Sequence, residues 1–306
     1  MKKAKHIVSG FVWAVIGLYI LAMILLHIPA FQAMLGNKVS EALSEKLATE
    51  VSVGRIDLGF ANRIIVDDVR MKDKEGKEML TASRLSAKID IVALMNGNIA
   101  ISSAQIFGMK GAFYKKADAD APNFQFVLDS LASKDTTKHT PLNLRIGSVV
   151  IRHSGFTYDD YGQPVTPNRF NVNHLNIDNI STHLLLPKLT DDSISLNLKR
   201  LSLTEASGLK IKDLALRLNA SKKQMSVDGF SLALPNSTIR LDSLFATYEF
   251  NDGKLSMPTL RYEGIVPESS ITPSDISCFI PELSKINKPI KLKTSVSGRA
   301  VSQSRE

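Results

Sequence analysis

Cysteine is nearly absent from this 306-residue chain, which contains only Cys278. A single cysteine excludes an internal disulfide and any paired-cysteine metal site, and we expect it to be a small buried apolar side chain. Aromatic residues make up only 7% of the chain, and its lysines and arginines are scattered between apolar positions. Nucleic-acid binders need basic patches interleaved with stacking aromatics, so we expect no nucleic-acid partner.

Catalytic motifs are also missing. The chain has no His-Glu-x-x-His, no Gly-x-Ser-x-Gly and no phosphate-binding glycine loop, and its six histidines lie far apart. Ser207 and Lys210 match the first box of serine acyl-enzymes, but the companion boxes are absent. Asp159 and Asp160 are adjacent, and adjacent strand residues point to opposite faces. We therefore expect no enzyme and no cofactor or metal.

Charged residues are absent from Ile7 to Ile28. These 22 residues would form a helix about 33 Å long, enough for a hydrocarbon core of about 30 Å. We interpret residues 1–30 as a transmembrane anchor, since a cleaved signal peptide usually has an apolar core of about 7–15 residues. Three lysines, Lys2, Lys3 and Lys5, predict a cytoplasmic N-terminus. The bulk of the chain would then lie beyond that membrane.

A short amphipathic helix is predicted over residues 31–50, between the anchor and the first strand. Its apolar positions fall near helical spacing: Phe31, Met34, Leu35, Val39, Ala42, Leu43 and Leu47. Two interpretations stay open. The helix either lies against lipid where the chain leaves the membrane, or packs on the following strands as a cap.

An eight-residue pattern recurs along the rest of the chain: apolar, any, apolar, any, polar or small, apolar, any, apolar. Its copies start at Val51, Ile64, Ile99, Leu144, Leu175, Leu196, Leu209, Met225, Ile239 and Leu255. The later starts lie 13 to 16 residues apart, a spacing typical of one strand plus one turn. Turn signals such as Asn251-Asp252-Gly253 lie between copies. The pattern predicts a mainly β fold, a long antiparallel meander with two short helices, the second over residues 123–133 and capped by Asn123.

Each copy slips by one residue at its fifth position. In the copy starting at Leu209, the slip falls at Lys212-Asp213. A β-bulge adds one residue, restores the phase and bends the strand, so bulges in successive strands would curve the sheet. The alternative is a crossover that gives each face half of the apolar residues. The bulge interpretation predicts a groove lined by Leu209, Ile211, Leu214, Leu216, Val227, Leu232, Ile239, Leu241 and Leu244.

One face of such a sheet would be apolar along roughly 45–50 Å, at about 4.8 Å per strand. Two short helices are too small to cover it. Either the sheet folds over into a sandwich with its own core, or the concave face holds something apolar, because soluble proteins rarely expose large apolar patches without a function.

Residues 49–131 resemble the N-terminal region of the translocation and assembly module (TamB) family, within the AsmA-like superfamily. The matching features, in chain order, are Val53-Gly54, Asp68-Val69, Asp73 with Gly76, Leu80 with Ala82, the step Leu94, Gly97, Ile99 and Ile101, and Asn123-Phe124. The resemblance divides the chain into an N-terminal family-like β region, residues 51–140, and continuing groove repeats, residues 141–306. Because full-length members are far longer, it also predicts that the C-terminus is truncated.

The resemblance implies an inner-membrane protein with a taco-shaped periplasmic groove. It would conduct phospholipids toward the outer membrane by shielding their acyl chains. A barrel of the outer-membrane assembly superfamily is the implied partner of the full-length protein. Two alternatives stay open: an assembly factor that docks β-strands of outer-membrane proteins, and a tethered β-sandwich that binds envelope partners.

Overall fold

The computed structural model describes residues 28–59, 63–89, 101–118, 121–131, 143–190, 192–251 and 254–299, with isolated positions before Ile28. Its elements are α2 (Pro29–Leu47), β1 (Val51–Gly59), β2 (Arg63–Lys72), β3 (Glu78–Ile89), β4 (Ile101–Phe107), β5 (Lys110–Lys115), α4 (Gln125–Leu131), β6 (Asn143–Asp160), β7 (His174–Thr190), β8 (Ser193–Glu205), β9 (Lys210–Ser221), β10 (Gln224–Ala233), β11 (Thr238–Thr247), β12 (Phe250–Asn251), β13 (Lys254–Leu255), η1 (Met257–Thr259), β14 (Arg261–Ile271), η2 (Pro273–Ile276), η3 (Pro281–Lys285) and β15 (Ile290–Arg299).

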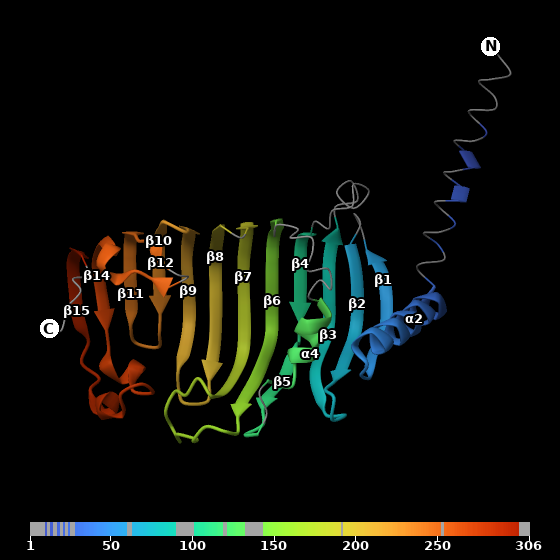
Figure 1. Cartoon of the computed structure of the whole chain (residues 1–306), viewed down its shortest axis with the longest axis horizontal. Coiled ribbons are helices and arrows are strands. Elements are labelled where there is room, and N and C mark those ends of the chain that lie inside the picture. Colours follow the sequence, from blue (N-terminus) through green and yellow to red (C-terminus); the bar gives the residue numbers. More distant parts are fainter. Residues whose placement is uncertain are drawn as a thin grey trace, which may run out of the picture.

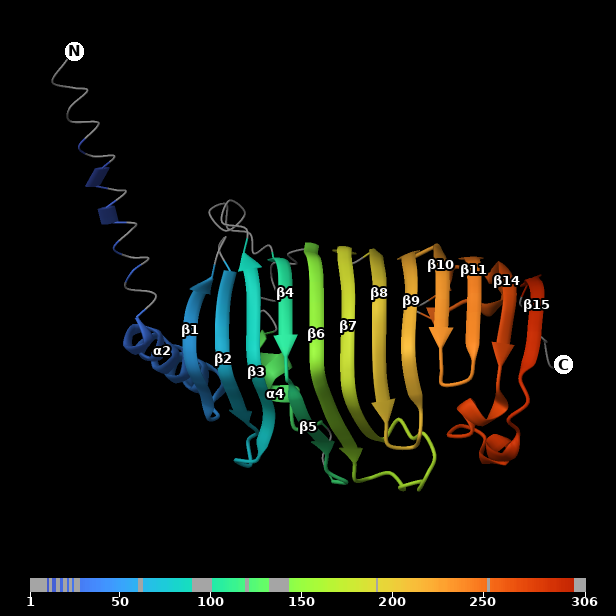
Figure 2. The same ribbon diagram turned by 180° about the vertical axis from the view of Figure 1, so that it is seen from behind.

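One 13-stranded sheet dominates the described part of the chain. Its strands follow the order β1-β2-β3-β4-β6-β7-β8-β9-β10-β11-β14-β15, with β5 beside β3 and β6. Figure 1 shows them as a single row from β1 to β15, and Figure 2 shows the same row from behind. The predicted mainly β fold is confirmed. The sandwich alternative is wrong for the described residues, because the strands form one continuous sheet and only the small β12–β13 hairpin lies outside it.

The sheet is not a pure antiparallel meander, because both β4 and β5 run parallel to β6. These two strands are halves of one interrupted strand. Between them the amide of Met109 donates to Ser154 Oγ at 3.1 Å, and Ser154 is completely buried. After α4, strand β6 begins at the same rim of the sheet as β4. A strand that starts from the same rim as β4 must run parallel to β4. The eight-residue sequence pattern does not indicate the rim at which a strand starts, so it did not predict this pairing.

Helix α2 spans the predicted region, but its buried face differs from the predicted apolar stripe. Met34 is exposed, whereas Gln32 and Gly36 are buried together with Leu47. Pro29 opens the helix, where its missing N–H costs nothing, and Ala48 ends it in the left-handed conformation at φ 48°.

Helix α4 begins two residues later than predicted, and Asn123 does not cap it as predicted. The Asn123 side chain bonds to β5 instead: Oδ1 accepts from the Tyr114 amide at 3.0 Å, and Nδ2 donates to the Ala112 carbonyl at 3.1 Å. The repeat copy at Leu255 is also not an eight-residue strand. There β13 ends and the 3-10 helix η1 follows, with Pro258 inside it.

Within the described residues no helix is both long enough and apolar enough to cross a membrane. The predicted anchor from Ile7 to Ile28 lies largely outside the described residues, and Lys2, Lys3 and Lys5 lie entirely outside them.

The predicted bulge at Lys212-Asp213 is confirmed by the pairing of β9 with β8. Ile211 pairs with Leu203 and Leu214 pairs with Leu201, so three steps along β9 match two steps along β8. Residues directly opposite each other in a ladder share a face, and Leu203 and Leu201 are two apart. The extra residue therefore brings Ile211 and Leu214 to the same face.

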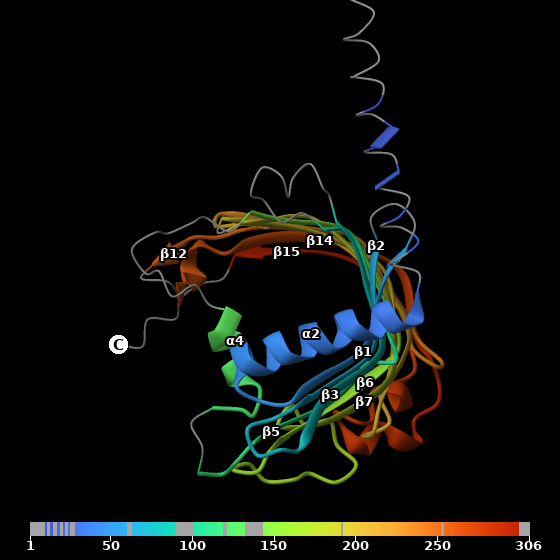
Figure 3. The ribbon, with the colours of Figure 1, turned by 90° about the vertical axis from the view of Figure 1, so that its right-hand side faces the viewer.

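Residues with irregular backbone conformation occur in strands across much of the sheet. Four described residues inside strands have positive φ, namely Asp68 at 55°, His153 at 52°, Asn179 at 56° and Gly229 at 59°, and so does Gly108 at 62° between β4 and β5. Asp, Asn and Gly tolerate this left-handed region best, which explains the fifth residue in three copies of the repeat, Asp68, Asn179 and Gly229. Bulges bend strands. Figure 3 shows the result: the sheet curves into an arc, each strand runs from one rim to the other, and α2 and α4 lie on the concave side.

Candidate functional site: the concave apolar face

Aromatic contacts with α4 identify the residues that point into the concavity. The Phe113 ring on β5 lies 5.3 Å from that of Phe124, just before α4, and 6.2 Å from that of Phe156 on β6, measured between ring centroids. Because α4 lies on the concave side, Phe113 and Phe156 face that side too. Phe156 pairs directly with Ile177 of β7, so the same face continues onto the next strand.

The pairing of neighbouring strands extends this concave face to β8 and β9. Ile177 pairs with Glu205, and Leu203 and Leu201 lie two and four residues before Glu205 along β8. Leu201 in turn pairs with Leu214 of β9. The leucines of these strands therefore point into the concavity, and the bulges keep them there.

We call the resulting set on β8–β11 the apolar face. Each member sits opposite an apolar residue across the ladders, in phase with those just named, and Leu241 sits opposite Phe230: Leu196, Leu198, Leu201, Leu203, Ile211, Leu214, Leu216, Leu218, Val227, Leu232, Ile239, Leu241 and Leu244. Every one of these side chains is half-buried. Neighbours on adjacent strands shield them laterally, while α2 and α4 lie at the β1 end of the concave side, away from β8–β11, and the small β12–β13 hairpin and η1 lie toward one rim.

Eight of the nine predicted lining residues belong to this face, and all of them lie on β9, β10 or β11. Leu209 is the exception: it lies in the turn before β9, where its carbonyl accepts the Glu205 amide at 2.8 Å. The prediction missed Phe156 and Ile177, and it omitted the leucines of β8. The repeat copy starting at Leu196 already contained the signal for the latter.

Tight packing is concentrated at the other end of the sheet. Nine apolar residues of the described part are buried, and six of them belong to α2 or β1–β3: Leu47, Val51, Val53, Val69, Met79 and Ala82. The molecule thus has a closed end under α2 and an open end along the apolar face.

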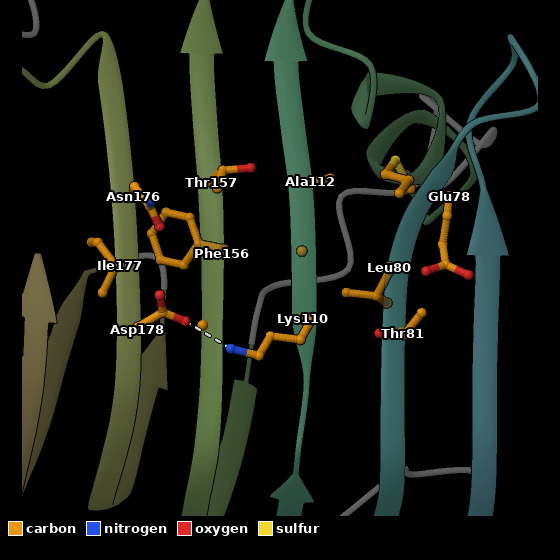
Figure 4. Close-up of a pocket in the computed structure, with 13 residues that line it drawn as sticks. Glu78, Leu80, Thr81, Lys110, Ala112, Phe156, Thr157, Asn176, Ile177 and Asp178 are labelled. Carbon is orange, nitrogen blue, oxygen red and sulfur yellow. Dashed lines mark hydrogen bonds and ion pairs between the residues drawn. The ribbon is translucent and has the colours of Figure 1, made fainter. Parts of the chain in front are cut away.

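A hollow of about 250 Å³ lies on β3, β5, β6 and β7, between the closed and open ends. Figure 4 shows Leu80 and Phe156 on either side of β5. The residue between them in register is Gly111, which has no side chain to fill the gap. Lys110 Nζ and Asp178 Oδ1 form an ion pair at 2.7 Å beside the hollow.

The buried carboxylate of Asp73, in the β2–β3 turn, links this turn to Tyr114 at the end of β5 that lies near α4. Asp73 Oδ1 accepts the amides of Glu75 and Lys77 at 2.9 and 3.0 Å, and Oδ2 accepts the Tyr114 hydroxyl at 2.8 Å. Burial raises the pKa of Asp73, but the hydrogen bonds from Tyr114 and the turn amides outweigh burial and hold the pKa below its usual value. Burial of the Tyr114 hydroxyl and its hydrogen bond to Asp73 raise the pKa of Tyr114.

The described residues contain no group of three or more His, Cys, Asp or Glu side chains arranged to hold a metal ion. Cys278 is buried and unpaired, as predicted. A scan against protein-family models and a search of curated proteins find no match to this chain.

Proposed function

We propose that this protein is a membrane-anchored β-groove that conducts phospholipids by shielding their acyl chains on the apolar face. One observation carries the proposal: aliphatic side chains on four successive strands face the concave side of the sheet, away from α2 and α4. An aliphatic face of this length favours an apolar ligand over water.

The energetics suit an acyl chain. A chain of about sixteen carbons gains on the order of 12 kcal/mol from leaving water, at about 0.8 kcal/mol per methylene. Leucine, isoleucine and valine supply nearly the same surroundings on each strand, so no position is a deep trap. The polar head group stays in water on the open side of the arc.

The remaining parts of the proposal concern location and partners. An uncharged segment from Ile7 to Ile28 supports an inner-membrane anchor with a cytoplasmic N-terminus. Its described side chains Trp13, Leu18, Leu21 and Ile24 each expose more than half of their surface. The resemblance to the AsmA-like superfamily supports a periplasmic groove, phospholipids as cargo and, for a longer protein, an outer-membrane barrel partner.

Photo-crosslinking tests the proposal. A photoreactive residue at Leu214 should capture phospholipid in cells, whereas one at Arg217 should not. Arg217 is the matched control, because it is exposed on the same strand and pairs with Asn197 and Asp228 on the opposite face. Absence of lipid at Leu214 would contradict the conduit. Capture of nascent polypeptide there would instead favour the assembly function, in which outer-membrane strands dock on the protein.

A further inference from the structure

We infer that α2 is a fixed end wall of the groove, so that acyl chains reach the apolar face sideways, between the two rims. This inference rests on the proposed function and adds the route of loading to it. Figure 3 shows α2 crossing the inside of the arc at the β1 end.

The first observation is that α2 satisfies the outer edge of β1. Ser40 Oγ accepts the Val53 amide at 2.8 Å, and Ser44 Oγ accepts the Val51 amide at 2.9 Å and donates to the Val51 carbonyl at 3.1 Å. An edge strand normally leaves such groups free to pair with another strand. Here two helical serines take the place of that strand and close the edge.

The second observation is the closeness of the helix to the strand. A Cβ placed on Gly36 would lie 2.9 Å from the Val53 carbonyl oxygen and 3.0 Å from that of Gly54. Gly36, Ser40 and Ser44 are spaced by four, which puts them on one helix face. A larger residue at position 36 would therefore push α2 away from β1 and break both serine contacts.

The third observation is that the C-terminal end of α2 is tied to the β2–β3 turn. Lys74 Nζ donates to the carbonyls of Leu47 and Ala48 at 2.5 and 2.9 Å. Thr49 Oγ1 lies 3.0 Å from each of the carbonyl oxygens of Lys72 and Asp73. With two sets of bonds and most of the buried apolar residues beneath it, α2 forms part of the best-packed region of the molecule rather than a lid.

The open side of β8–β11 then provides the path to the apolar face. Helices α2 and α4 occupy the concave side at the β1 end, whereas near β9–β11 the small β12–β13 hairpin and η1 lie toward one rim. An acyl chain would slide in between the rims with its head group trailing in water.

Hydrogen exchange in the full chain tests the wall without lipid. In the variant S40A/S44A, the amides of Val51 and Val53 should exchange at least ten times faster. The matched control is E41A/E45A, which changes two exposed residues of the same helix and should leave these amides unchanged. If the amides of Val51 and Val53 exchange at the same rate in both variants, the two serines do not close the edge of β1, and the inference fails.

A reversible lock tests the route. The variant S40C/V53C would join α2 to β1 by a disulfide on oxidation, and the native Cys278 is buried. Lipid capture at Leu214 should agree within two-fold between oxidised and reduced protein. A loss of ten-fold or more on oxidation would show that α2 must swing aside, and the inference would fail. Capture in neither state would refute the conduit itself, while the exchange experiment would still decide whether α2 seals the edge.

Discussion

An aspartate at position 214 should stop lipid passage without unfolding the protein. Leu214 lies in the middle of the apolar face, paired with Leu201 on one side and Leu232 on the other. Because it is only half-buried, a carboxylate there keeps contact with water in the empty groove. We therefore expect L214D to fold, with a loss of stability smaller than the 2–5 kcal/mol typical of deleting a fully buried leucine.

The effect on transfer follows from desolvation. An acyl chain that covers the carboxylate must strip its water, and the effective penalty for one buried ion is several kcal/mol. Even about 3 kcal/mol of that penalty would slow passage about 100-fold, since about 1.4 kcal/mol is a factor of ten. Protonation removes the charge, so the defect should shrink as the pH approaches the usual aspartate pKa of about 4.

Transfer of a fluorescent phospholipid between vesicles measures this, with the full chain reconstituted in the donor population. L214M keeps the volume apolar and should transfer normally. R217D adds the same charge to the opposite face and should also transfer normally. Circular dichroism establishes that each variant is folded. A folded L214D that transfers lipid within two-fold of the parent protein at pH 7 would refute the reasoning.

Three further predictions test the parts that shape the groove. Gly229 has φ 59°, so G229V should cost about 1–3 kcal/mol and lower the midpoint of thermal unfolding. The pKa of Asp73 is lowered in the folded state, so the stability that its carboxylate contributes is present above about pH 4 and is lost as the pH falls through the pKa of the folded state. Urea unfolding at pH 7 and pH 3 measures this loss, and D73N should remove it. A Cβ on Gly111 would lie 2.6 Å from the Phe113 ring, so G111L should displace that ring and speed hydrogen exchange in α4 about ten-fold.

Local features of the groove were predictable from the sequence. The bulge at Lys212-Asp213 was visible because a bulge is a property of one strand and shifts the apolar phase within a few residues. The same reasoning placed Leu214 and Leu216 on one face before any neighbouring strand was known. Turn signals were equally local: β12 and β13 pair on either side of the Asn-Asp-Gly signal, with Asn251 opposite Lys254.

Non-local features were not predictable in the same way. The parallel pairing of β4 with β6 depends on the path of the chain that contains α4, and no periodicity records a path. The inner face of α2 was missed because its contacts with β1 are polar. A search for apolar spacing passes over Gly36, Ser40 and Ser44, although their spacing of four was available as a signal.

Curvature, exposure and direction are linked in this fold. A flat sheet with the same leucines would offer a broad apolar surface to any other sheet, whereas bulges turn that surface inward and restrict it to slender ligands. A lining of similar aliphatic residues has no preferred sense of transport, because each strand offers a lipid nearly the same free energy. The wall made by α2 makes the two ends of the groove different. If the proposed conduit carries lipid, any net direction must therefore come from what loads lipid between the rims and what removes it farther along the sheet, not from the apolar face itself.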